Sequence, residues 1–222
     1  MKKAFTLAEV LITLVVIGIV AAITINIIFN NQEEAYRSGL KKCSSVLQQA
    51  FRKASLDNGG FIPASWGMER QEMVDKIFKA NLRVAKDCGQ DVCNRGKNIE
   101  IKNLTGTANY STIESYVMYP GSVILQDGSF FYINSTAGSG SNGNITLDSI
   151  FVLVDVNGIY KKPNRLGKDV FYFQYDTRNE RLNAGSQITG WQGMDICDKT
   201  STDSSNGIGC ATKLLNNEKI PR

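Results

Sequence analysis

The sequence predicts an α+β fold in which one long N-terminal helix packs on an antiparallel β-sheet head. Two observations predict the helix. Residues 5–29 are an almost uncharged apolar run, and the residues that follow place apolar side chains at helical spacing. A third observation predicts the sheet, because beyond residue 110 apolar residues recur at every second position between turn-forming residues. We therefore expect a helical spine over residues 5–54 and a globular head over 55–222.

The apolar run FTLAEVLITLVVIGIVAAITINIIF contains one charged side chain, that of Glu9. A helix of 25 residues extends about 37 Å, enough to cross the ~30 Å hydrocarbon core of a membrane with some tilt. An ionised carboxylate inside hydrocarbon is costly, so Glu9 needs a partner or a functional role. Lys2 and Lys3 precede the run, and the positive-inside rule places them in the cytoplasm and everything after Phe29 outside.

The opening string KKA/FTLAEVLITL resembles the N-terminal signature of type IV pilins and type II secretion pseudopilins. The resemblance implies that prepilin peptidase cuts between Ala4 and Phe5 and that the new amine of Phe5 is then methylated. It also implies that Glu9 pairs with the amine of a neighbouring subunit during filament assembly. In a bundle of apolar helices such a pair would set the register, because each charge relieves the desolvation of the other. The chain departs from the family at Ala4, where glycine is strongly preferred.

Three other interpretations of the N-terminus compete with this one. An ordinary secretory signal peptide would end near Val20-Ala21-Ala22, but the apolar residues continue to Phe29. A plain single-pass anchor would not need Glu9. A buried core helix of a soluble protein rarely runs for 25 residues with one charge.

Residues 30–54 predict the second, amphipathic half of the spine. After the polar stretch at 30–34, apolar side chains recur in steps of four and three: Tyr36, Leu40, Cys43, Leu47, Ala50 and Ala54. The glycines at 59 and 60 end the helix. Cys43 lies on this stripe, so we expect a small buried hydrophobic residue, with a disulfide to the head as the alternative.

Farther along, the pattern predicts one short helix and several strands. The helix covers residues 66–86, with apolar positions at Met73, Val74, Ile77, Phe78, Leu82 and Ala85. Strands are expected at 110–119, 122–125, 129–133, 145–156 and 170–175, with a flexible Gly/Ser linker at 137–143.

Charge and cysteine content limit the function classes. The net charge of +4 falls to +2 without the two lysines of the leader, 4 − 2, which is too weak to indicate nucleic acid. Five cysteines without any histidine disfavour zinc and cysteine–histidine catalysis. Four cysteines form two close pairs, and we expect Cys88–Cys93 and Cys197–Cys210 disulfides, although three connectivities are possible.

A turn-rich segment at 155–169 raises the question of a metal. Major pseudopilins bind calcium in a loop between strands, and Asp155, Asn157 and Asp169 could supply oxygen ligands. A twelve-residue calcium loop counted from Asp155 fails, however, because Leu166 stands where an acid is required. We expect a structural turn and no cofactor, with calcium as the alternative.

The sequence contains no arrangement of residues typical of catalysis, so we expect a structural protein rather than an enzyme. The resemblance implies a filament subunit whose partners are further subunits, prepilin peptidase, an inner-membrane assembly platform and the membrane itself. The role would be protein secretion or surface attachment. The alternative is a membrane-anchored module whose outward head binds a ligand or DNA.

Overall fold

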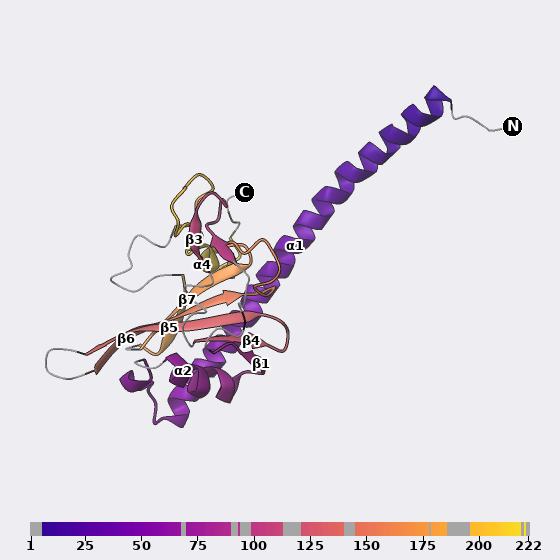
Figure 1. Ribbon diagram of the computed structural model, residues 1–222. Helices are drawn as coiled ribbons and strands as arrows, with labels where there is room; N and C mark the ends of the chain where they lie inside the picture. The colour runs from indigo at the N-terminus through magenta and orange to yellow at the C-terminus, as the bar shows by residue number, and fades with distance from the viewer. Residues whose placement is uncertain are drawn as a thin grey trace. The chain divides into compact units, whose positions relative to one another are not determined.

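The computed structural model describes residues 6–67, 70–89, 93, 99–112, 121–139, 145–177, 179–185, 196–218 and 220. The chain divides into two compact units, Met1–Tyr36 and Arg37–Arg222. The predicted boundaries of leader, apolar helix, amphipathic helix and head remain predictions. The helix α1 runs over Leu7–Asp57, so its last 21 residues, 37–57, belong to the second unit (Figure 1).

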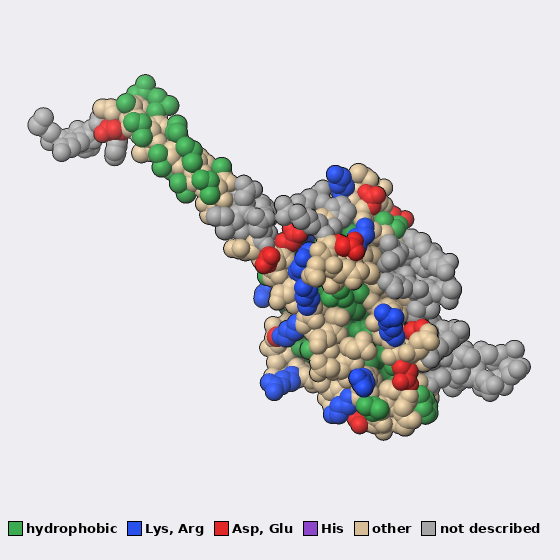
Figure 2. Space-filling model, turned by 180° about the vertical axis from the view of Figure 1, so that it is seen from behind, with side chains coloured by type: hydrophobic (Ala, Val, Ile, Leu, Met, Phe, Trp, Pro, Cys, Tyr) green, Lys and Arg blue, Asp and Glu red, His purple; other side chains and the backbone are tan. Residues whose placement is uncertain are grey.

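In the first unit, α1 is apolar over Leu7–Thr24 except for Glu9 and a few uncharged polar residues, and the polar stretch at 30–34 does not interrupt the helix. Hydrophobic side chains cover the visible surface of its N-terminal part (Figure 2). The window Leu7–Thr24 has a mean hydropathy of 2.6 and is long and apolar enough to cross a membrane.

In the second unit, α1 buries the stripe that its spacing predicts. Five side chains of the stripe are at most 4% exposed: Leu40, Cys43, Leu47, Ala50 and Ala54. Phe51 joins them, and its ring stacks on that of Tyr175 with centroids 4.4 Å apart. The helix ends where Gly60 donates its N–H to the carbonyl of Ser55 at 2.8 Å, with Gly59 and Gly60 both at positive φ.

The head is built on a six-stranded antiparallel sheet in the order β1-β4-β5-β6-β7-β8. Its strands are β1 Val84–Asp87, β4 Ser122–Leu125, β5 Phe130–Ser139, β6 Ile145–Asp155, β7 Val170–Asp176 and β8 Arg181–Ala184. At the β4–β5 turn, the Asp127 carboxylate accepts the backbone N–H of Ser129, and Gly128 adopts φ +88°. This turn is also tied to α1, because the Lys42 ammonium lies 2.6 Å from Asp127.

Both faces of this sheet are buried. One face packs on α1 through side chains such as Phe131, Val152 and Phe173. The opposite face, which includes Phe130, Leu153 and Tyr172, lies under β2 Glu100–Lys102 and loops that carry Ile159, Leu166 and Ile208. The strand β2 pairs with β3 Asn109–Thr112. Because it is covered twice, β7 buries six consecutive residues, from Val170 to Tyr175, rather than alternate ones.

The α+β fold with a long N-terminal helix and an antiparallel sheet is confirmed, and the architecture is pilin-like. Within it, two expected elements are wrong in part. The helix expected over 66–86 is confirmed over residues 70–81, where α2 Arg70–Met73 continues directly into the π-helical segment η2 Val74–Lys79. At its ends the expectation is wrong, because η1 Ala64–Gly67 is a separate short helix and residues 84–87 form the edge strand β1. Pairing of Val84 with Leu125 outweighs the helical spacing, because this strand extends a sheet edge.

The flexible linker expected over 137–143 is also wrong in part. The strand β5 continues to Ser139, where it pairs with Ile145 of β6, although residues 140–144 lie outside the described residues. Pairing in a hairpin supplies backbone partners to residues whose composition alone suggests a linker. Of the strand expected over 110–119, residues 110–112 belong to β3 and the rest lie outside the described part. The short helix α4 Cys210–Leu215 was not predicted.

We predict that Phe51→Ala lowers the free energy of unfolding by about 3–5 kcal/mol, because it removes a fully buried ring from the interface of helix and sheet. Urea unfolding of the full chain in detergent micelles, followed by near-UV circular dichroism, measures the loss. The matched control is Phe61→Ala, at a ring that is 55% exposed, which should change stability by less than about 0.5 kcal/mol. Equal losses in the two variants would contradict the proposed packing.

Candidate functional site

The N-terminal end of α1 places Glu9 in a defined local geometry. The Thr6 hydroxyl and the Thr6 backbone N–H each donate to Glu9 Oε2 at 2.8 Å. In return, the backbone N–H of Glu9 points to the Thr6 hydroxyl oxygen at 3.3 Å. This reciprocal pairing at a spacing of three residues is a capping box, which satisfies backbone donors that a helix start leaves free.

The capping box gives the Glu9 carboxylate a defined orientation on the helix. The carboxylate lies in the first turn of α1, where the helix macrodipole favours a negative charge. Thr6 was not among the residues that sequence reasoning selected. The Thr-x-x-Glu spacing could have identified it, because that spacing is the signature of a capping box.

The apolar surface around Glu9 is uncovered in the isolated chain. Leu7 is 79% exposed, Ile12 65% and Ile17 63%, and no side chain in the window Leu7–Thr24 is buried. A contiguous apolar surface of this length is unstable in water, so it requires lipid or the helices of other subunits. The two residues of the expected cleavage, Ala4 and Phe5, lie outside the described residues.

Residues 1–25 match the family model of the prokaryotic N-terminal methylation motif. The chain carries a prepilin-type cleavage and methylation segment. Comparison with characterised proteins and with solved structures finds no match. The motif supports a type IV pilin-like or pseudopilin precursor. Members of this class are structural rather than catalytic. The motif also implies processing by prepilin peptidase and assembly into a filament. The apolar helix is consistent with the membrane anchoring of such a precursor.

Beyond the prepilin-type segment, the structure brings the four head cysteines together in local pairs. Cys88 bonds to Cys93 and Cys197 bonds to Cys210, with Cα–Cα distances of 5.1 and 5.0 Å. Cys43 is free and buried on the helix stripe. Burial raises the pKa of the Cys43 thiol to about 12, so the thiol stays neutral and acts as a small apolar side chain.

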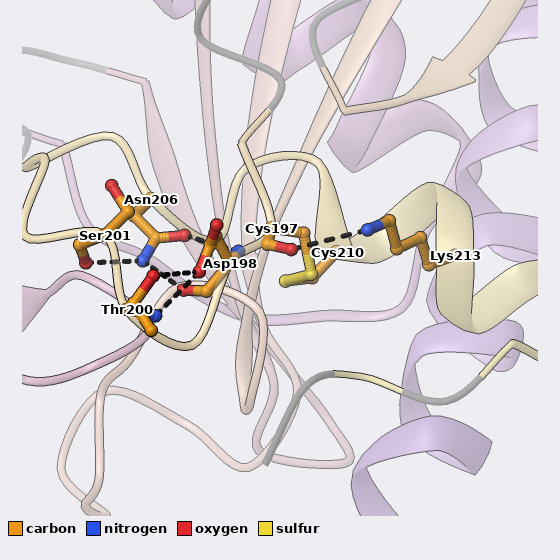
Figure 3. Close-up of a disulfide and its surroundings, with 7 residues drawn as sticks. All are labelled: Cys197, Asp198, Thr200, Ser201, Asn206, Cys210 and Lys213. Atoms are coloured by element: carbon orange, nitrogen blue, oxygen red, sulfur yellow. Dashed lines mark hydrogen bonds between the residues drawn. A yellow bond between two sulfur atoms is a disulfide. The ribbon is translucent and has the colours of Figure 1, made fainter.

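The loop between Cys197 and Cys210 is organised by one buried amide, that of Asn206 (Figure 3). Asn206 accepts the backbone N–H of Asp198 and donates to the carbonyls of Asp198 and Ser201 at 2.7 and 2.8 Å. Lys213 of α4 donates to the Cys197 carbonyl at 3.3 Å. A loop rich in serine and aspartate, which composition alone suggests is flexible, therefore has a hydrogen-bonded interior.

The same loop is fastened to the β2–β3 turn. The buried Asn103 side chain donates to the carbonyl of Asp203 at 3.0 Å, and the Leu104 N–H donates to the Asn206 carbonyl at 2.7 Å. The loop is thus part of the layer that covers the second face of the sheet, rather than a free appendage. This arrangement presents its exposed acids, Asp198 and Asp203, on a fixed backbone.

The turn-rich segment at 155–169 folds around two buried carboxylates. Asp155, 2% exposed, accepts the N–H groups of Asn157 and Gly158 at 3.1 and 2.9 Å. Asp169 is fully buried and accepts the N–H groups of Asn164 and Arg165 at 2.9 and 2.8 Å. Burial raises the pKa of both carboxyls, and the charge of Asp169 raises the pKa of Asp155 further.

The donor types in this segment suit a hard cation only in part. The buried amide oxygens of Asn157 and Asn164 accept no hydrogen bond, and carboxylate and amide oxygens are ligands that calcium prefers. However, the carboxylates of Asp155 and Asp169 already accept hydrogen bonds from backbone N–H groups. In the described part of the chain, no three Asp, Glu, Cys or His side chains form a metal-binding group. The structural turn therefore remains our expectation for Asp155, Asn157 and Asp169.

We predict that Asp155→Asn stabilises the head at neutral pH, because the amide oxygen keeps the two N–H bonds while the buried charge is removed. The pKa of Asp155 is higher in the folded than in the unfolded state, so the wild type loses stability as the pH rises between those two pKa values. The variant should therefore unfold at a higher urea concentration at pH 7, and the difference should disappear toward the unfolded pKa of about 4. Urea titrations across this pH range provide the measurement.

The control is Asp57→Asn, at an exposed carboxylate of α1, which should leave the pH profile unchanged. The same titrations with and without millimolar calcium test the turn against a metal site. A stabilisation by calcium that Asp155→Asn abolishes would overturn the structural role.

Proposed function

We propose that this protein is a structural subunit of a type IV filament, pilin-like or pseudopilin-like, that serves protein secretion or surface attachment. The observation that supports it best is the methylation motif on an exposed apolar segment, Leu7–Thr24, in which Glu9 is the only acid. A plain anchor needs the helix but gives no reason for a carboxylate in its first turn.

In this proposal the chain inserts into the inner membrane with Lys2 and Lys3 in the cytoplasm and the head in the periplasm or outside the cell. Prepilin peptidase cuts between Ala4 and Phe5 and methylates the amine of Phe5. Glu9 then becomes the fifth residue of the mature chain, one helical turn from the new terminus.

Assembly moves the apolar helix from lipid into a bundle of identical or related helices, with the help of an inner-membrane assembly platform. The apolar surface supplies packing in any register, so packing alone does not select one. The carboxylate of Glu9 selects the register, because only one stagger brings it to the methylated amine of a neighbour. The capping box with Thr6 keeps the carboxylate hydrogen-bonded in the membrane-inserted subunit before assembly.

We predict that Glu9→Gln and Glu9→Ala both leave the protein inserted and cleaved but reduce filament yield to below about a tenth of the wild-type level, since neither variant has the charge that selects the register. Shearing of filaments from cells and immunoblotting measures the yield, and intact mass measures cleavage and methylation. Glu9→Gln keeps an acceptor for Thr6, so it separates the role of the charge from that of the hydrogen bonds. Normal filaments from Glu9→Gln would contradict the proposed charge pair.

We predict an intermediate yield for Thr6→Val, which removes the hydroxyl that holds Glu9 but leaves the backbone N–H bond and the charge. The matched control Thr6→Ser retains the hydroxyl and should assemble as the wild type does. The same shearing assay distinguishes them. If Thr6→Val and Thr6→Ser assemble equally, orientation by the hydroxyl plays no part.

The intact mass of the protein from its native cells also tests the whole proposal. A chain that begins with methylated Phe5 supports the filament subunit. An uncut chain that begins with Met1 would leave only a tethered module with an outward head.

A further inference from the structure

We propose that the head binds an acidic sugar unit, such as a uronic acid of an extracellular polysaccharide, in a cleft between β2 and the loop that follows β6. The proposal concerns the head alone and does not depend on filament assembly. The cleft has a volume of about 450 Å³, within the range of small-ligand sites.

Positive charge dominates the lining of this cleft. Among the described residues, Lys102 on β2 and Lys162 and Arg165 on the loop line it, together with one acid, Glu100. The Lys102 ammonium lies 4.0 Å from the Glu100 carboxylate, the outer limit of an ion pair. Among the residues that the structure describes, neither Lys162 nor Arg165 forms an ion pair, so their charges are available to a carboxylate ligand.

The cations are carried on a backbone that is fixed before any ligand binds. The Lys102 N–H donates to the Asn164 carbonyl and the Leu166 N–H donates to the Lys102 carbonyl, both at 2.9 Å, so the loop pairs with β2. Asp169 holds the N–H groups of Asn164 and Arg165 from inside. A pre-organised site loses less conformational entropy on binding than a flexible one.

One further contact fixes the Arg165 side chain. Its guanidinium lies against Gly106, where an added Cβ would come within 2.6 Å of the guanidinium carbon. Gly106 has φ +77°, a conformation that favours glycine. The β2–β3 turn thus leaves room for a cation at the edge of the cleft.

Apolar side chains complete the lining and indicate the rest of the ligand. Pro163 and Tyr160, which is 49% exposed, present apolar surface to the cleft, whereas Ile99 and Ile159 lie buried beneath it. The Tyr160 hydroxyl donates to the Cys93 carbonyl, so the ring is anchored next to the Cys88–Cys93 disulfide. A sugar ring matches this combination, since its C–H face packs on aromatic and aliphatic surface while its carboxylate meets the cations.

The same observations disfavour a nucleic acid. Binding of a strand requires a row of cations that follows successive phosphates and several aromatic rings for successive bases. Here the described lining of the cleft has three cations and one tyrosine together with an acid. A lone phosphate would use the cations but leave the apolar lining without a partner.

The experiment is isothermal titration of the full chain in detergent micelles with trigalacturonate, and with neutral galactotriose as the uncharged probe. We expect binding of trigalacturonate that weakens as NaCl is raised, and no binding of galactotriose. The double variant Lys162→Gln/Arg165→Gln should lower the affinity at least about tenfold, because it removes two charge-assisted contacts. The matched control is Arg52→Gln/Lys53→Gln, the same change of charge at exposed positions of α1, which should stay within about twofold.

Separate outcomes would overturn the proposal. Absence of binding to trigalacturonate would exclude the cleft as its site. So would an equal loss of affinity in both double variants, provided that both keep the thermal stability of the wild type. A single-stranded oligonucleotide that binds more tightly through Lys162 and Arg165 would exclude the sugar. Inorganic phosphate that binds as tightly as trigalacturonate would reduce the cleft to a general anion site. Filament yield from Lys162→Gln/Arg165→Gln should match the wild type, which separates this proposal from that for Glu9.

Discussion

The apolar surface of α1 is the constraint on which the rest of this protein depends. In residues 40–54 that surface is a stripe, and the sheet covers it through contacts such as Phe51 on Tyr175. In residues 7–24 it extends around the helix, and none of the described side chains in this window is buried. The hydrophobic effect therefore determines both the packing of the head and the need of the first unit for lipid or for other helices.

Glu9 is the one charged residue among residues 7–24. Apolar side chains pack without a preferred direction, whereas the hydrogen bonds of the capping box between Thr6 and Glu9 are directional. The methylation motif over residues 1–25 includes this pair. In the head, buried polar side chains hold the loops of the second layer in place. Asn103 and Asn206 do so in the β2–β3 turn and the loop at 197–210, and Asp155 and Asp169 do so in the segment at 155–169.

Much of the fold could be predicted because its signals are local. The helical stripe from Leu40 to Ala54, the glycines at 59 and 60, and the hairpin around Asp127-Gly128 each follow from spacing or turn chemistry within a few residues. The edge strand β1 could not be predicted in this way, because Val84 and Ala85 fit a helical pattern as well as a strand pattern. Only the pairing of Val84 with Leu125 in the sheet decides between the two. The continuation of β5 through Gly138 and Ser139 likewise depends on Thr146 and Ile145 across the hairpin.

The sequence by itself determined the apolar N-terminal segment and the place of Glu9 within it, because hydropathy and charge are properties of consecutive residues. It also indicated the two close cysteine pairs. Only the tertiary structure decided that a second layer covers the sheet, that the loop at 197–210 is fastened to the β2–β3 turn, and that Lys102 meets Lys162 and Arg165 at one cleft. These features join residues about 60 to 100 positions apart, and such contacts depend on how strands and loops close in three dimensions rather than on any local preference.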